Sequence, residues 1–186
     1  MNKKVITKKK TTTICTILVA FLLAGLAVTP VFASTEEDLT PIETADNPGD
    51  GVRHFFAGLL SRTFRYQKSM TEFIGSSLNS ADGSVLRAQN KLEDLIEEGR
   101  DVEMLEDALV DFEDLLDSAE NAYNAAQSLV DLHSGFNREG RVVDIEEARR
   151  TVTAIEPNLQ EARETIIEAI KLIYDAIQDY RAANEI

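Results

Sequence analysis

The fold is decided by residues 145–183, which read IEEARRTVTAIEPNLQEARETIIEAIKLIYDAIQDYRAA. Apolar or small side chains recur there alternately at three and four residues: Ile145, Ala148, Val152, Ile155, Leu159, Ala162, Ile166, Ala169, Ile173, Ala176, Tyr180 and Ala183. This period is typical of a helix that packs a narrow apolar stripe against partner helices. Pro157 removes one backbone hydrogen bond, but the stripe keeps its phase across it, so we expect a kink and not a break.

Residues 102–133 repeat the pattern, with a stripe formed by Leu105, Leu109, Phe112, Leu116, Ala119, Tyr123, Ala126 and Val130. Gly99 favours a left-handed cap before this segment, and Asp101 suits the N-cap of the new helix. Gly135 is typical of the helix end, and Asp144 begins a capping-box-like start for the next helix. No alternation of period two accompanies these stripes, so the sequence predicts an all-α protein.

Residues 52–98 carry a third stripe, although glycines and serines interrupt it. Its members are Leu60, Phe64, Gln67, Met70, Ile74, Leu78, Ala81, Val85, Ala88, Leu92 and Leu95. The stretch SSLNSADGS contains helix-breaking residues, yet the phase continues through it. We therefore predict one long helix, since each helical glycine costs only ~1 kcal/mol. A break near 79–84 is the alternative, and residues 52–78 would then fold back as a separate helix.

Short connections between the three segments predict that neighbouring helices are antiparallel. The expected fold is thus an elongated antiparallel three-helix bundle or coiled coil, formed by a single domain over residues 52–186. With a break near 79–84, the bundle would have four helices.

The first 33 residues have the composition of a secretory signal peptide. Five lysines lie within residues 3–10, an apolar run extends from Ile14 to Val28, and Val31-Phe32-Ala33 follows. We predict cleavage after Ala33, with an uncleaved membrane anchor as the alternative. Residues 34–51 are rich in acids, proline and glycine, and predict a disordered acidic linker.

Composition argues against several classes of function. The chain has 19 Lys+Arg and 33 Asp+Glu; without the five leader lysines, 14 basic and 33 acidic residues leave a formal charge of −19. Nucleic acid is therefore excluded as the main partner, because phosphate binding needs Lys and Arg. The only cysteine, Cys15, lies in the leader, so a disulfide or cysteine-based zinc site is not expected. With only His54 and His133 and no nucleophile or phosphate-loop motif, we expect no enzyme and no cofactor.

Residues 52–68, VRHFFAGLLSRTFRYQK, form the most informative surface. They contain four basic residues and no acid, whereas residues 92–131 contain fourteen acids and one arginine. The candidate interaction surface consists of Phe55, Phe56, Leu59, Leu60, Phe64 and Tyr66. Three roles are open: packing on the protein's own acidic hairpin, self-association with another chain, or contact with a membrane surface, client or peptide.

The connection at 135–146 spaces oxygen-bearing side chains as a calcium loop does. Counting Gly135 as position 1 places Asn137 at 3, Glu139 at 5 and Glu146 at 12. These positions match the oxygens and final carboxylate of an EF-hand loop, although position 1 lacks its Asp. We treat the three residues as a candidate metal site. The alternative is a plain helix–helix connection in which Gly140 makes a turn.

Two stretches, GRDVEMLEDALVDF (99–112) and HSGFNREGRVVD (133–144), resemble uncharacterised exported bacterial all-helical proteins over about residues 90–183. That resemblance implies an exported helical protein and carries no activity with it. In size and class the chain is also similar to small periplasmic helical stress chaperones of the Spy and CpxP type, whose repeated L-T-x-x-Q motif is absent here.

These features predict an exported, non-enzymatic helical interaction or structural protein of the cell envelope. It would lie in the periplasm, at the cell surface or outside the cell. Its partner would be another protein or a second copy of itself, and a membrane would be contacted only through the leader or residues 52–68. An extracytoplasmic calcium-binding protein and a periplasmic-type chaperone are the alternatives.

Overall fold

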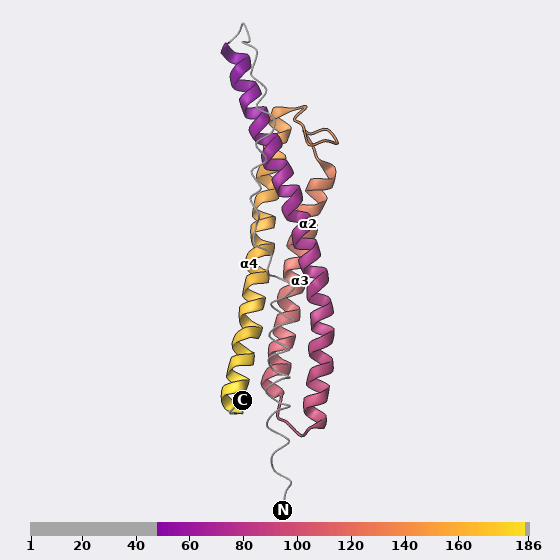
Figure 1. The fold of residues 1–186 in the computed structure, drawn as a ribbon. Coiled ribbons are helices and arrows are strands. Elements are labelled where there is room, and N and C mark those ends of the chain that lie inside the picture. The colour runs from indigo at the N-terminus through magenta and orange to yellow at the C-terminus, as the bar shows by residue number, and fades with distance from the viewer. Residues whose placement is uncertain (1–47, 185–186) are drawn as a thin grey trace, which may run out of the picture. The chain divides into compact units, whose positions relative to one another are not determined.

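The computed structural model describes residues 48–184, which form three α-helices (Figure 1). Helix α2 spans Pro48–Glu97, α3 spans Glu103–Leu132 and α4 spans Ile145–Ala183. Within this range no strand forms, and one isolated β-bridge joins Phe136 to Val142. The predicted all-α bundle is confirmed. The predicted leader, residues 1–33, and most of the predicted linker lie outside the described residues.

The start of α2 differs from the sequence prediction. The helix begins at Pro48, so residues 48–51, which we assigned to the linker, are helical. Proline suits the first position of a helix, because its fixed φ is already helical and its missing N–H would have no partner there. The boundary lies within the few residues by which a helix end is usually uncertain.

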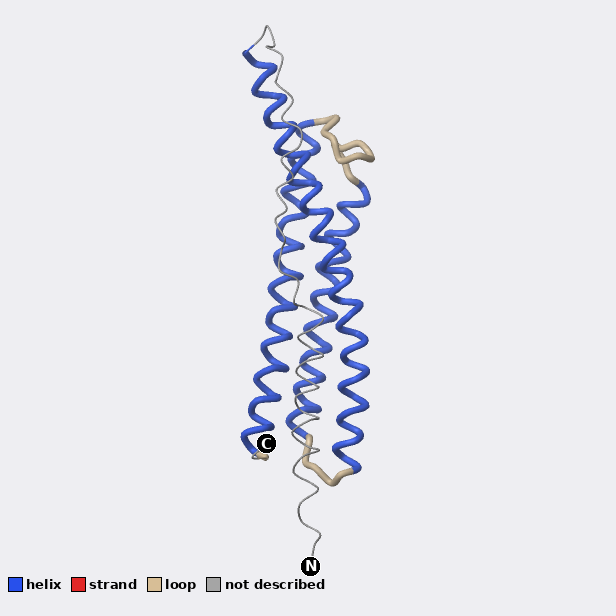
Figure 2. The backbone as a smooth tube through the Cα atoms, in the orientation of Figure 1, coloured by secondary structure: helices blue, strands red, loops and turns tan. Residues whose placement is uncertain are grey.

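The described chain divides into two compact units, and every helix contributes a segment to each. Unit 1 comprises residues 73–123 and 160–184, and unit 2 comprises residues 48–72 and 124–159. Figure 2 shows the connection of each unit as a tan loop between blue helices. Each unit has its own buried side chains, and the positions of these follow the stripes in the sequence.

Unit 1 contains the tight turn between α2 and α3. Gly99 adopts φ +75°, its N–H donates to the Ile96 carbonyl (2.8 Å), and the Arg100 N–H donates to the Leu95 carbonyl (3.0 Å). This pair of bonds is the Schellman motif expected of a C-terminal glycine. Asp101 Oδ1 then accepts the Glu103 N–H (3.3 Å) at the start of α3. The core of the unit is formed by Ile74, Leu78, Leu92, Leu95, Leu105, Phe112, Leu116, Ile166, Ile173 and Ile177.

The glycine- and serine-rich stretch of α2 does not break the helix. Asn79 Nδ2 donates to the Gly75 carbonyl (2.9 Å), and Ser80 and Ser84 hydroxyls donate to carbonyls four residues earlier (2.9 and 3.1 Å). Their polar groups are thus satisfied within the helix. Gly75 allows the Tyr123 side chain to pack closely against α2, because a Cβ at residue 75 would lie 2.6 Å from Tyr123 Oη. The alternative with a fourth helix is therefore wrong.

Unit 2 contains the longer connection between α3 and α4. The Gly135 carbonyl accepts the N–H groups of Val143 (2.8 Å) and Asp144 (3.2 Å), which closes the loop on itself. Asp144 Oδ1 accepts the Glu147 N–H (2.9 Å), as the capping-box pattern predicts. The Thr151 hydroxyl donates to the Ser134 carbonyl (2.8 Å) and ties the loop to α4.

A polar layer holds α2 against α4 in unit 2. Gln67 is 1% exposed, and its Nε2 donates to the Val152 carbonyl and to Glu156 Oε2, both at 2.9 Å. These bonds lie beside Pro157, through which α4 continues without a break, as the phase of its stripe predicts. Pro157 has no N–H to donate to the Thr153 carbonyl four residues earlier, and Gln67 binds the carbonyl next to it, that of Val152.

Replacement of Gly135 by alanine is expected to be far more damaging than replacement of Gly99. Both adopt positive φ, but a Cβ at Gly135 would lie 2.1 Å from the Ala148 nitrogen, whereas one at Gly99 meets nothing within 4 Å. Gly99→Ala should cost about 1–2 kcal/mol of unfolding free energy. Gly135→Ala should cost roughly 2–5 kcal/mol, since steric overlap adds to the strain. Urea unfolding followed by circular dichroism measures both, and equal losses would contradict the described packing of the loop.

Replacement of Gly83 by alanine is expected to stabilise the protein. Gly83 is helical, and a Cβ there would meet only the Arg87 guanidinium at 3.5 Å, an ordinary contact. A gain of roughly 0.5–1 kcal/mol follows from the better helix propensity of alanine. The same unfolding measurement applies, and a loss of stability would indicate that the helix is interrupted at this point.

Candidate interaction surface

The α2 segment in unit 2 carries a row of exposed apolar side chains between Val52 and Tyr66. Val52 is 55% exposed, Phe55 67%, Phe56 51%, Leu59 51% and Tyr66 54%. The two phenylalanine rings meet edge to face, with centroids 5.9 Å apart. We call these five residues the exposed stripe. Apolar side chains gathered on one side of a helix mark a contact site more often than single exposed ones do.

Two of the six predicted surface residues do not belong to the exposed stripe. Phe64 is 3% exposed and stacks on Phe136 with ring centroids 4.1 Å apart, so its assignment to the interaction surface is wrong. Leu60 is half-buried. The physical reason is the return of the loop, whose Val142 N–H donates to Ser61 Oγ (3.2 Å) and which thereby covers this side of α2.

The basic residues of the segment divide into two pairs. Arg53 and Arg62 are exposed beside the exposed stripe, and neither forms an ion pair with a residue in the part of the chain that the structure describes. Arg65 and Lys68 instead line a cavity of about 390 Å³ within unit 2, beside Arg138 of the loop. The exposed stripe is therefore an apolar surface flanked by two arginines, Arg53 and Arg62, whose charges are available to a partner.

The candidate calcium-binding residues form hydrogen bonds and an ion pair within the α3–α4 connection and the first turn of α4. Asn137 Oδ1 accepts the N–H groups of Glu139 (3.1 Å) and Arg141 (2.9 Å), and Asn137 Nδ2 donates to Glu139 Oε2 (2.7 Å). Glu146 pairs with Arg149 at 3.0 Å in the first turn of α4. Asn137 and Glu139 are therefore brought together, whereas Glu146 is engaged elsewhere. Over residues 48–184, no group of three or more His, Cys, Asp or Glu side chains could hold a metal ion.

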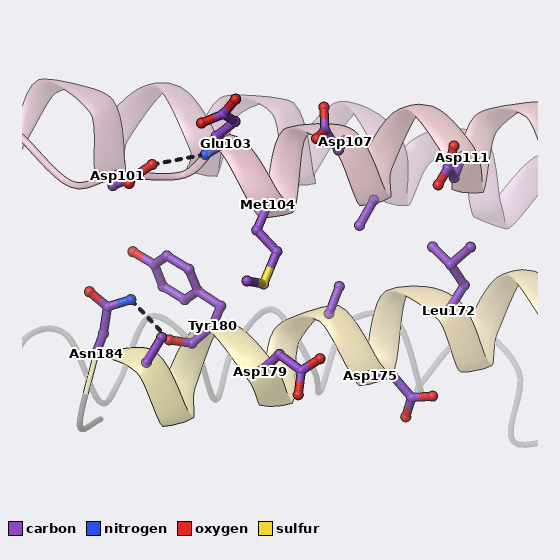
Figure 3. Close-up of a pocket in the computed structure, with 13 residues that line it drawn as sticks. Asp101, Glu103, Met104, Asp107, Asp111, Leu172, Asp175, Asp179, Tyr180 and Asn184 are labelled. Carbon is purple, nitrogen blue, oxygen red and sulfur yellow. Dashed lines mark hydrogen bonds between the residues drawn. The ribbon is translucent and has the colours of Figure 1, made fainter.

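Unit 1 holds a second surface, which the sequence patterns did not indicate. A groove of about 900 Å³ lies between the start of α3 and the end of α4. Figure 3 shows Met104 and Tyr180 directed into the space between the two helices, with acidic side chains along both of them. We call this the acidic groove; its acids are Asp101, Glu103, Asp107, Asp111, Asp175 and Asp179. Charge counts along the chain show many acids, but only the pairing of α3 with α4 brings these together.

No helix in the described range is both long and apolar enough to cross a membrane. The chain matches no family model, no curated protein and no solved structure. The resemblances noted in the sequence therefore remain predictions, and the two surfaces must be interpreted from their own chemistry.

Truncation of Phe64 and of Phe56 should have very different effects on stability. Phe64→Ala removes a buried ring that stacks on Phe136, and a loss of about 3–5 kcal/mol is expected. Phe56→Ala removes a ring that is half exposed, so a change within about 1 kcal/mol is expected. Urea unfolding of the two variants decides between core and surface roles. A large loss in Phe56→Ala would mean that the exposed stripe is part of the folding core.

Proposed function

We propose that the protein is an exported, non-enzymatic interaction protein of the cell envelope, and that it acts by docking the exposed stripe on another protein. The observation that carries this proposal is the row of five apolar side chains on α2, each at least half exposed. Burial of such side chains contributes about 25 cal/mol per Å² of apolar surface removed from water. Residues 52–68 include four aromatic residues and three arginines, and these residue types are enriched at protein interfaces.

The charge distribution favours a protein partner over an anionic membrane. The segment 52–68 is basic, but after the predicted leader the chain has 14 basic and 33 acidic residues. A net negative charge of this size repels anionic lipid head groups, while a local basic segment can still recognise a complementary acidic surface. The predicted leader supports a location outside the cytoplasm, because an apolar run after a lysine-rich start directs export.

Polar substitution of the exposed stripe is expected to remove the interaction while leaving the fold intact. The variant Phe55→Ser, Phe56→Ser, Leu59→Ser should lose its partners and any self-association, because the substituted side chains no longer gain from burial. The test is light scattering after size exclusion, together with affinity capture from an envelope fraction, using the chain that starts at Ser34.

A matched control is available within the same protein. Leu86, Val110 and Ile167 are 61%, 57% and 55% exposed and lie outside the exposed stripe. Their joint replacement by serine should leave both association and capture unchanged. If the stripe variant keeps its molar mass and its captured proteins, the proposed function is wrong.

A further inference from the structure

We propose that the acidic groove of one copy binds the exposed stripe of a second copy, so that the protein associates with itself through two different surfaces. This inference rests on the proposed function and names the partner that the exposed stripe would engage. It follows from three properties of the two surfaces: their chemical character, their charge and their length.

The acidic groove has an apolar floor suited to an added helix. Met104, Ala108, Leu172, Ala176 and Tyr180 line it, and Met104 is 49% exposed. Figure 3 shows this floor between the backbones of α3 and α4. A helix laid between two others packs its apolar ridge into the groove that they form. The exposed stripe provides such a ridge, with Val52, Phe55, Phe56 and Leu59 at spacings of three and four and Tyr66 two helical turns further on.

The charges of the two surfaces are complementary. The acidic groove is lined by six carboxylates and by no lysine, arginine or histidine. Carboxylates along α3 and α4 give the groove a negative potential, and cations placed beside it are attracted by that potential. Arg53 and Arg62 lie beside the exposed stripe, and no described residue pairs with either of them. Docking of the stripe would place these guanidinium groups near the acidic rims.

The lengths of the two surfaces are also similar. The helical part of the lining of the acidic groove extends from Glu103 to Asp111 on α3 and from Leu172 to Ala183 on α4. At 1.5 Å per helical residue these segments are roughly 12 and 17 Å long, and the exposed stripe from Val52 to Tyr66 is roughly 21 Å long. About two to three helical turns can therefore be in contact.

A symmetric contact between two exposed stripes fits less well. It would bring Arg53 and Arg62 of both copies together, and like charges at an interface oppose association. The contact between stripe and groove joins two different surfaces, one in unit 2 and one in unit 1. Such a heterologous contact continues from copy to copy, so it produces either a closed ring or an open fibre.

Cross-linking of single-cysteine variants tests which surfaces meet. The chain from Ser34 contains no cysteine, so Leu59→Cys marks the stripe and Met104→Cys marks the groove without background. After treatment with a short bismaleimide, a mixture of the two variants should give a covalent dimer, and neither variant alone should give one. Leu86→Cys mixed with Met104→Cys is the control, since Leu86 is exposed on α2 outside the stripe, and should give none.

Charge reversal tests the chemistry of the contact. Asp107→Lys with Asp175→Lys in the groove, or Arg53→Glu with Arg62→Glu beside the stripe, should each weaken self-association by about tenfold or more, because like charges would then face each other. Glu93→Lys with Glu168→Lys changes net charge as much as the groove pair does, but at exposed sites elsewhere, and should have little effect. Equilibrium sedimentation measures the association constants.

Several outcomes would overturn the proposal. A covalent dimer of Leu59→Cys alone would show that stripe pairs with stripe. Loss of association in the stripe variants but not in the groove variants would exclude the groove and leave the proposed function standing. A chain that is monomeric at all concentrations, or that associates only when residues 1–33 are present, would exclude the second copy as occupant. If the stripe variants also keep every other partner, the proposed function fails with it.

Discussion

Each helix of this protein can bury only a narrow stripe, and the rest of the structure depends on that constraint. A helix between two neighbours hides the residues that recur at three and four positions, and anything apolar outside that arc stays in water. Several buried positions are alanines with no exposed surface, among them Ala119, Ala148 and Ala162. Small side chains at such positions allow close approach of the helices, which leaves little room to cover residues off the stripe. Val52, Phe55 and Leu59 lie outside the buried face of α2, and so they are available for contacts with another molecule.

Some of the buried positions in unit 2 are occupied by polar side chains. Gln67 and Thr71 are each 1% exposed, and the Thr71 hydroxyl donates to the Gln67 carbonyl at 2.8 Å. Gln67 Oε1 is buried without a hydrogen-bond partner among the described residues, which costs about 1–3 kcal/mol of stability. Apolar side chains slide past one another at little cost, whereas the bonds of Gln67 to Val152 and Glu156 are satisfied in one alignment only. The polar layer therefore specifies how α2 meets α4 at the expense of stability.

The carboxylates of the protein have different electrostatic effects on the exposed helix surfaces and in the acidic groove. Along most of the helices, exposed carboxylates face water, where high dielectric and salt weaken their repulsion. In the acidic groove, carboxylates from two helices line one concave surface above an apolar floor. Charge of one sign in a concave, partly apolar site produces a stronger local field than the same charge on a convex surface. Arg53 and Arg62, beside the exposed stripe, have the opposite charge, and no described residue forms an ion pair with either of them.

The sequence by itself determined the helices, because helical periodicity and capping are local properties of the chain. Gly99, Asp101 and Asp144 end or begin helices where their chemistry predicts, and the phase of the α2 stripe correctly indicated continuity through Gly83. Tertiary structure decided which apolar residues remain exposed and can contact another molecule. Both Phe64 and Phe56 were assigned to the candidate interaction surface, but the connecting loop places Phe136 over Phe64 and leaves Phe56 half exposed. It also assembled the acidic groove, since Asp107 and Asp175 are far apart in the chain and share a surface only because α3 packs against α4. Local patterns carry no information about such distant neighbours, and those neighbours determine the candidate site.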